Sequence, residues 1–201
     1  MLMPVVKYRE ALDSVMRRPV FGTEDLHHEK IPNSYSKKLL HMLAKSGKIR
    51  SIEKGKYTCL DDPVAVAAFI TRPSYISLWM AMSIRNLTDQ VPFAIEVVTS
   101  RRRFRSRIEF LGTPIIFHTV SPKLMFGYEN IIWKGNIRVP VASREKIIID
   151  AVYTGGISEE EIMPVLKVSD TSMLRKYAKL AGDKPTEDKI ERMIKCLHRK
   201  R

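Results

Sequence analysis

The feature that most restricts the fold is an amphipathic helical pattern followed at once by a short hairpin. Residues 34–46 have apolar side chains at the spacing of one helix face, namely Tyr35, Leu39, Leu40 and Leu43. Gly47 stands where glycine commonly ends a helix. Residues 48–52 and 56–60 suit two strands around a glycine-containing turn at 53–55. The sequence therefore predicts a helix and a hairpin in direct succession.

Two shorter helical segments precede this pair. Residues 8–16 have an amphipathic pattern that stops before Pro19, and residues 24–28 follow Thr23, a residue that can cap a helix amino terminus. Three short helices followed by a lysine-containing hairpin are typical of a winged helix-turn-helix. We therefore expect residues 1–61 to form a DNA-binding domain of this kind.

The rest of the chain predicts a mixed α+β domain that ends in helices. Asp61, Asp62 and Pro63 mark its start, because proline is favoured in the first turn of a helix. We expect helices at 64–70 and 75–84, strands at 93–99, 104–111, 114–120, 131–133 and 137–141, and helices at 143–153, 158–166, 171–180 and 186–197. Ser143 and Ser158 are the expected caps of two of these helices. The predicted fold class is thus α+β, with a winged helix-turn-helix at 1–61 and a mixed domain at 62–201.

Composition restricts the partners of the chain. Thirty-five Lys and Arg against 22 Asp and Glu give a net charge of +13, which favours a polyanionic partner. Cys59 and Cys196 are too few for a disulfide scaffold or a paired-cysteine zinc site. Apolar runs stay well below the ~18 residues that a membrane span requires. We expect a cytoplasmic protein that needs no membrane, metal or cofactor, and the oligomeric state stays open.

The third helix and the hairpin provide candidate DNA contacts. The amino terminus of a helix offers N–H groups to phosphate, and its first turns can enter the major groove. Lysine can reach guanine N7 and O6, and serine can bind phosphate or base. The candidates are Ser34, Ser36, Lys37, Lys38 and His41 on the helix, and Lys54 and Lys56 on the hairpin. A solvated helix face is the alternative, and the basic hairpin favours DNA recognition.

A second basic segment, residues 101–107, has an arginine at five of its positions. If it is a strand, alternation places Arg103, Arg105 and Arg107 on one face and directs Phe104 to the opposite, inner face. Clustered guanidiniums repel one another, so we expect them to face solvent or an acidic partner. The candidates for binding nucleic acid or a protein partner are Arg101, Arg102, Arg103, Arg105 and Arg107. A protective charged edge strand is the alternative.

Patterns that indicate an enzyme are missing from the sequence. The five histidines show no zinc spacing, and neither a phosphate-binding glycine loop nor a nucleophile elbow is found. The pair Asp61 and Asp62 is explained by helix capping. Glu145 and Asp150 diverge around a helix and do not form an acid/base pair. We therefore expect no catalytic activity.

Three segments resemble the AbiEi family of antitoxins from type IV toxin-antitoxin systems. They read IRSIEKGKYTCL, DDPVAVAAFITRPSYISLWMAMSIRNLTDQVPFAIEVVTSRRR and IRVPVASREKIIIDAVY, and the likeness spans about residues 5–155. The resemblance implies an amino-terminal winged helix that binds operator DNA and represses its own operon, and a second domain that counters a nucleotidyltransferase toxin. It also points to residues of the family's pattern whose spacing the fold explains equally well: Tyr75, Ser77, Arg144, Glu145 and Asp150.

The sequence therefore predicts a transcriptional autorepressor that also acts as an antitoxin, with its own operator DNA and a nucleotidyltransferase toxin as partners. Two alternatives remain. One is a nucleic-acid-processing or RNA-binding component that holds its substrate through residues 101–107. The other is a solitary transcriptional regulator that has no toxin.

Overall fold

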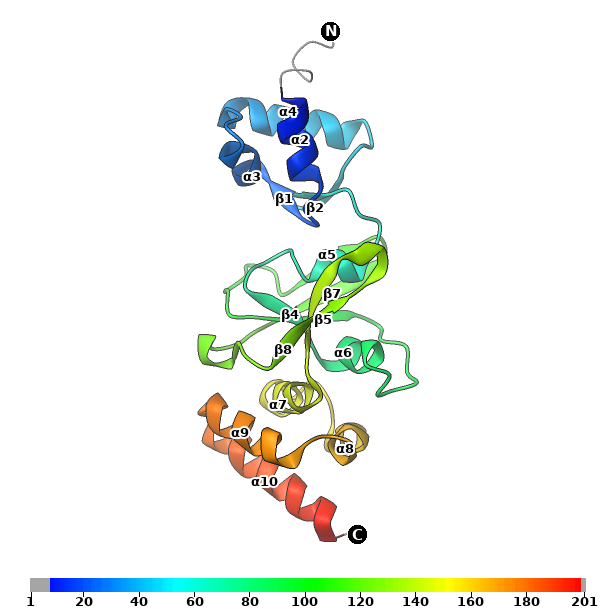
Figure 1. Ribbon diagram of the computed structural model, residues 1–201, viewed down its shortest axis with the longest axis vertical. Coiled ribbons are helices and arrows are strands. Elements are labelled where there is room, and N and C mark those ends of the chain that lie inside the picture. Colours follow the sequence, from blue (N-terminus) through cyan, green and yellow to red (C-terminus); the bar gives the residue numbers. More distant parts are fainter. Residues whose placement is uncertain (1–7, 200–201) are drawn as a thin grey trace.

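The computed structural model describes residues 8–199 and has an α+β fold. Residues 1–7 and 200–201, the outer ends of the two predicted domains, lie outside the described residues. The elements follow one another along the long axis (Figure 1). Three helices and a small sheet lie at one end, a larger sheet lies in the middle, and the carboxy-terminal helices lie at the other end.

The three predicted amino-terminal helices are present as α2 (Arg9–Met16), α3 (Thr23–His28) and α4 (Asn33–Lys45). The prediction that Thr23 caps α3 is wrong, because Thr23 is the first residue of the helix. The Asp25 carboxylate instead accepts the backbone N–H of Gly22 at 2.7 Å. The helices enclose an apolar cluster with side chains from each of them, among them Leu12, Leu26, Leu39 and Leu40.

A three-stranded antiparallel sheet closes this end of the molecule. The predicted hairpin forms from β2 (Arg50–Glu53) and β3 (Lys56–Thr58), and β1 (Phe21–Gly22), which the sequence did not indicate, pairs with β3. Gly22 lies so close to the hairpin turn that a Cβ atom there would be 2.5 Å from the Gly55 carbonyl oxygen. Only glycine fits at position 22, because the atom that a side chain would meet belongs to the backbone of Gly55.

The central sheet has six strands in the order β6-β7-β5-β4-β9-β8. Five of these strands correspond to predicted ones: β5 (Ile95–Thr99), β6 (Arg107–Phe110), β7 (Thr113–Thr119), β8 (Tyr128–Ile132) and β9 (Arg138–Ala142). The sixth, β4 (Ser74–Ile76), was not predicted. β5 runs parallel to β7 and β4 runs parallel to β9, whereas the other neighbours are antiparallel. The sheet is therefore mixed, with both parallel and antiparallel neighbours.

The helix predicted at 75–84 is wrong in its first part. Tyr75 pairs with Val98 of β5, and Ile76 pairs with both Val97 of β5 and Val141 of β9. The helix α6 begins only at Leu78 (Leu78–Ile84). A short apolar run suits a buried strand as well as a helix, and here pairing with two neighbouring strands decides in favour of the strand.

The remaining helices are α5 (Pro63–Ala67), α7 (Arg144–Thr154), α8 (Glu159–Lys167), α9 (Thr171–Ala181) and α10 (Lys184–Arg199). α5 is shorter than predicted, and α10 begins two residues earlier. Both predicted caps are confirmed: Ser143 accepts the N–H of Lys146 at 3.2 Å, and Ser158 forms a capping box with Glu161. α7 lies between the sheet and the helices α9 and α10 (Figure 1).

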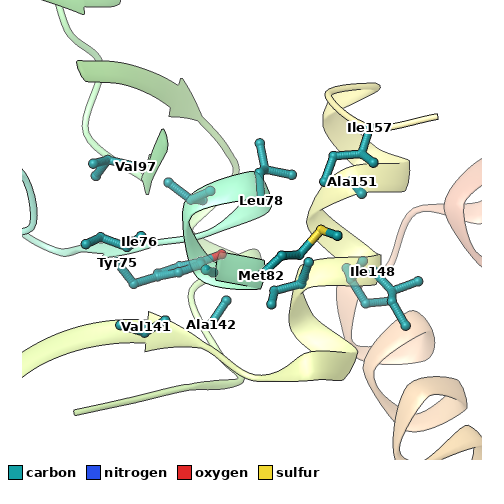
Figure 2. Packing of buried hydrophobic residues seen from close by; sticks show 14 of the residues in the cluster. Tyr75, Ile76, Leu78, Met82, Val97, Val141, Ala142, Ile148, Ala151 and Ile157 are labelled. Carbon is teal, nitrogen blue, oxygen red and sulfur yellow. The ribbon is translucent and has the colours of Figure 1, made fainter. Parts of the chain in front are cut away.

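The buried apolar residues form two clusters. The smaller one lies among α2, α3 and α4, and the larger one joins the central sheet to α6, α7 and the last helices. Figure 2 shows Leu78 and Met82 of α6 between the sheet residue Ile76 and the helix residues Ile148 and Ala151. Three partly buried side chains from the amino-terminal end pack against the larger cluster: Val20, Ile52 and Leu60. The amino-terminal part of the chain is therefore in contact with the larger apolar cluster.

Candidate nucleic-acid interface

Four of the predicted helix contacts share the solvent face of α4. Ser34, Lys37, Lys38 and His41 are all exposed, and their spacing of three, four and seven residues from Ser34 places them on one side of the helix. Pro32, which precedes α4, offers no side-chain cap to the first N–H groups of the helix. This side of α4, which we call the helix face, therefore combines hydroxyl, ammonium and imidazole groups.

Ser36 is not part of the helix face, so its predicted DNA contact is wrong. Its side chain is fully buried, and its hydroxyl donates to the Pro32 carbonyl at 3.1 Å. Ser36 has the helical spacing of the buried residues Leu39, Leu40 and Leu43, so the geometry of α4 turns it inward. Two residues apart on a helix, Ser34 and Ser36 point in different directions.

At the hairpin, the two predicted lysines have different roles. Lys54 lies exposed in the turn between β2 and β3. Lys56 is half-buried, and its Nζ lies 2.9 Å from a Glu53 carboxylate oxygen and donates to the Ile70 carbonyl. The ammonium group of Lys56 thus holds the hairpin against the second part of the chain, and a contact of Lys56 with DNA stays a prediction.

Arg103 does not lie on an exposed strand face, contrary to the prediction. Its side chain is only 8% exposed, its Nη2 lies 2.6 Å from Glu53, and its guanidinium covers the Phe117 ring at 3.9 Å. Residues 101–106 form a loop that precedes β6, so the assumed alternation does not apply and Phe104 points outward. We call residues 101–106 the arginine loop.

Glu53 is a residue that the sequence analysis missed. Burial alone would raise its pKa, but hydrogen bonds from Lys56 and Arg103 keep the pKa of this carboxyl below its ordinary value. The ionised Glu53 thus joins the hairpin to the arginine loop. The only local sign of this role was a carboxylate between basic residues at the turn. The sequence does not show the pairing with Arg103, because Arg103 is distant along the chain.

Other predicted arginines remain at the surface. Arg101, Arg102, Arg105 and Arg107 are exposed, although Arg101 also donates from Nε to the Arg72 carbonyl at 3.2 Å. Arg107 begins β6, and its guanidinium lies 6.0 Å from the centre of the Phe93 ring.

Three hollows join the helix face, the hairpin turn and the arginine loop. The first lies at α3 and α4 and is lined by Thr23, Glu24 and Lys37. Thr23 and Glu24 also line the second hollow, which continues to Lys54 and Lys56. The two lysines line the third hollow together with residues of the arginine loop, Arg102, Arg103, Phe104 and Arg105. Because neighbouring hollows share residues, they form one surface, which we call the basic surface.

The acidic groups of the basic surface are largely paired with cations. Asp25 lies 2.5 Å from Arg18, and Glu53 is bound by two cations. Among residues 8–199, no carboxylate oxygen lies within 4.0 Å of the charged groups of Lys54, Arg102 or Arg105. The basic surface therefore offers cations for an external anion, from the hairpin as well as from the loop.

A second polar cluster lies inside the larger apolar core. Asp150 accepts hydrogen bonds from the Tyr75 hydroxyl at 3.0 Å and the Ser77 hydroxyl at 2.7 Å. Lys146 Nζ lies 2.8 Å from the other Asp150 oxygen, Oδ1, as a buried ion pair, without the geometry of a hydrogen bond. Its ammonium faces the Phe126 ring at 4.5 Å. The resemblance pointed to Tyr75, Ser77 and Asp150, and it missed Lys146, whose i,i+4 spacing from Asp150 was visible.

Burial controls the ionisation of this cluster. It lowers the pKa of Lys146 against the opposing effect of Asp150, and it raises the pKa of Asp150 against the effects of Lys146 and both hydroxyls. Burial and the nearby carboxylate also raise the pKa of Tyr75. The side chains of Lys146 and Asp150 are 0% and 1% exposed, so no substrate reaches them. The arrangement is that of a structural polar cluster.

Two further residues from the resemblance join helices at the surface. Arg144 donates to the Val168 carbonyl at 3.4 Å, and Glu145 accepts the backbone N–H of Asp170 at 3.1 Å. These contacts connect the start of α7 to the segment between α8 and α9.

Comparisons with known proteins include a distant structural likeness. No protein-family model matches the chain, and no curated protein matches it. Among solved structures, the crystal structure of the RV2827C protein from Mycobacterium tuberculosis is similar, with 13% sequence identity and a TM-score of 0.45. The alignment covers 94% of this chain and 82% of that chain. The function proposed below therefore rests on the residues of this chain.

Within residues 8–199, no helix is both long and apolar enough to cross a membrane. The same part of the chain has no group of three or more His, Cys, Asp or Glu side chains placed to hold a metal ion. Cys59 and Cys196 are exposed free thiols.

Proposed function

We propose that this chain is a DNA-binding transcriptional regulator whose amino-terminal part is a winged helix-turn-helix. The observation that supports this proposal is the continuity of the helix face of α4 with the exposed Lys54 at the hairpin turn. A helix of 13 residues that presents two lysines, a serine and a histidine on one face suits the major groove. The adjacent hairpin then follows the phosphate backbone.

The proposed contacts divide into two kinds. Lys37 and Lys38 read base edges, because lysine can donate to guanine N7 and O6. Ser34 and the first N–H groups of α4 bind phosphate, as helix amino termini do. Lys54 binds phosphate from the hairpin side, where it contributes affinity without sequence information.

We expect Lys37→Ala/Lys38→Ala to lose discrimination between operator and competitor DNA. Each well-formed base contact contributes about 1–3 kcal/mol of discrimination, so the affinity for the operator falls much more than that for competitor DNA. Lys54→Ala should instead weaken both equally and reduce the slope of log K against log salt by about 0.9. The measurement is a titration of the full chain against DNA from upstream of its own gene, at several salt concentrations.

Lys195→Ala is the matched control, because Lys195 is an exposed lysine on α10 at the opposite end of the molecule. It removes the same charge and should leave the discrimination unchanged. Equal losses on operator and competitor DNA from the α4 variant would contradict base reading by this helix. No duplex binding by the full-length protein would contradict the proposed function itself.

The resemblance to the AbiEi family supports a second part of the proposal, that the chain represses its own operon and counters a nucleotidyltransferase toxin. We expect co-expression of the chain to restore growth of cells arrested by a nucleotidyltransferase encoded next to its gene. Lys37→Ala/Lys38→Ala should restore growth equally well, because the helix face is assigned to DNA. Continued growth arrest together with intact operator binding would support the alternative that the chain is a solitary transcriptional regulator without a toxin.

A further inference from the structure

The backbone of the arginine loop is held in place at its start, middle and end. At its start, Arg101 Nε donates to the Arg72 carbonyl oxygen at 3.2 Å. In its middle, the side chain of Arg103 is buried against the Phe117 ring. At its end, the Ser106 carbonyl accepts the backbone N–H of Phe117 at 2.7 Å. The held backbone therefore presents three exposed side chains at defined positions: Arg102, Phe104 and Arg105.

Phe104 has no packing role among the described residues. Its side chain is 101% exposed, so it buries no apolar surface in the fold. It lines the hollow at the hairpin turn together with Lys54 and the loop arginines. An apolar ring on a fixed loop, surrounded by cations, combines the two features that DNA-bending proteins use, phosphate binding and insertion of an apolar side chain between bases.

The position of the arginine loop indicates which ligand it binds. The hollow at the arginine loop is continuous, through Lys54, with the surface that ends at the helix face of α4. A duplex that follows this surface from α4 past the hairpin turn has its next phosphates at Arg102 and Arg105. These two guanidiniums have no carboxylate partner within 4.0 Å among residues 8–199.

We propose that the arginine loop is a second contact to the same DNA duplex, in which Arg102 and Arg105 bind phosphates and Phe104 inserts into the minor groove. This inference rests on the proposed DNA-binding function and extends it to the second part of the chain. Insertion unstacks one base step and bends the duplex toward the major groove. The bend carries the phosphates beyond the hairpin toward the two arginines.

Glu53 and Arg103 give this contact its geometry. Their 2.6 Å ion pair fixes the loop relative to the hairpin, so that Lys54 and Phe104 are presented together. A loop whose backbone is already held before binding loses little backbone conformational entropy when DNA binds. Arg103 is therefore a positioning residue, whereas Arg102, Phe104 and Arg105 touch the DNA.

The test measures DNA bending and base unstacking with the full chain and an operator duplex. Energy transfer between end labels reports the bend, and a fluorescent adenine analogue placed at successive steps reports unstacking. We expect Phe104→Ala to remove both signals and to weaken binding about tenfold, near the lower end of what an aromatic–base contact contributes. Phe104→Ala should keep the ratio of operator to competitor affinity that Lys37 and Lys38 set, measured with competitors that differ from the operator at base steps away from the wedge.

Matched variants separate the wedge from general effects. Phe104→Leu should restore the bend, because leucine also acts as a wedge. Phe93→Ala should have no effect, since Phe93 is 79% exposed but does not line the basic surface. Arg102→Ala/Arg105→Ala should reduce the slope of log K against log salt by about 0.9 for each of the two lost phosphate contacts.

Two results would overturn the inference while leaving the proposed function intact. The first is that Phe104→Ala binds and bends the operator as the unchanged chain does. The second is that Phe104→Ala leaves duplex binding unchanged but abolishes binding of single-stranded nucleic acid or rescue from the toxin, which would assign the loop to another partner. Failure of the unchanged chain to bind any duplex would remove the proposed function and the inference together.

Discussion

Asp150→Ala is expected to destabilise the protein by about 3–5 kcal/mol, the range for breaking a buried ion pair from one side. The substitution leaves the ammonium of Lys146 buried without its counter-charge at 2.8 Å. It also removes the acceptor of the Tyr75 and Ser77 hydroxyls, which are enclosed by the core. Unsatisfied buried donors cost about 1–3 kcal/mol each, so the loss should fall at the upper end of the range.

Denaturant unfolding of the chain measures this effect. Asp188→Ala is the control, because Asp188 forms an exposed pair with Lys184 at 3.0 Å, and solvent screening leaves such pairs little effect on stability. Lys146→Met/Asp150→Ala should recover part of the loss, since it removes the buried charge together with its partner. A loss from Asp150→Ala as small as that from Asp188→Ala would show that the buried cluster does not stabilise the fold.

Leu40→Ala should lower the stability of the amino-terminal cluster by about 2–5 kcal/mol and strongly weaken DNA binding. Leu40 is 1% exposed and packs in the smaller apolar cluster, on the side of α4 opposite the helix face. Proteins have only about 5–15 kcal/mol of stability in total, so a small cluster tolerates such a cavity poorly. The loss of DNA binding then follows from disorder of α4 and not from a missing contact.

The two tryptophans make this prediction measurable. Trp79 and Trp133 both pack against the larger cluster, so their fluorescence reports that part alone, whereas circular dichroism reports helices from both parts. We expect Leu40→Ala to shift the dichroism transition and to leave the fluorescence transition in place. Leu180→Ala, on an exposed leucine of α9, should shift neither by more than about 0.5 kcal/mol. Equal shifts of both signals would mean that the two clusters unfold together.

Much of the secondary structure could be predicted because its signals are local. The helices α7 and α8 have serine caps beside their first turns, and α4 shows its buried face in the spacing of its leucines. The strand at Tyr75 and Ile76 was missed for the opposite reason. Its state depends on backbone pairing with Val97, Val98 and Val141, none of which lies near it in the sequence.

The candidate site was predicted in part for the same reason. The residues of the helix face follow from helical spacing alone, and the same spacing, applied to Ser36, would have excluded it. The position of Arg103 could not be predicted from the sequence, because Arg103 binds Glu53 across the fold. The contact of Lys56 with the Ile70 carbonyl was likewise not visible in the sequence. Local alternation gives no information about a partner fifty residues away.

The contact between Gly22 and the hairpin turn restricts how this protein can diverge during evolution. With the Gly55 carbonyl 2.5 Å from where a side chain would begin, position 22 has no room for any residue larger than glycine. The exposed position of Lys54 is free of this restriction. Descendants of this chain can therefore exchange the side chain at position 54 of the hairpin tip, while the glycine at position 22 is inherited unchanged.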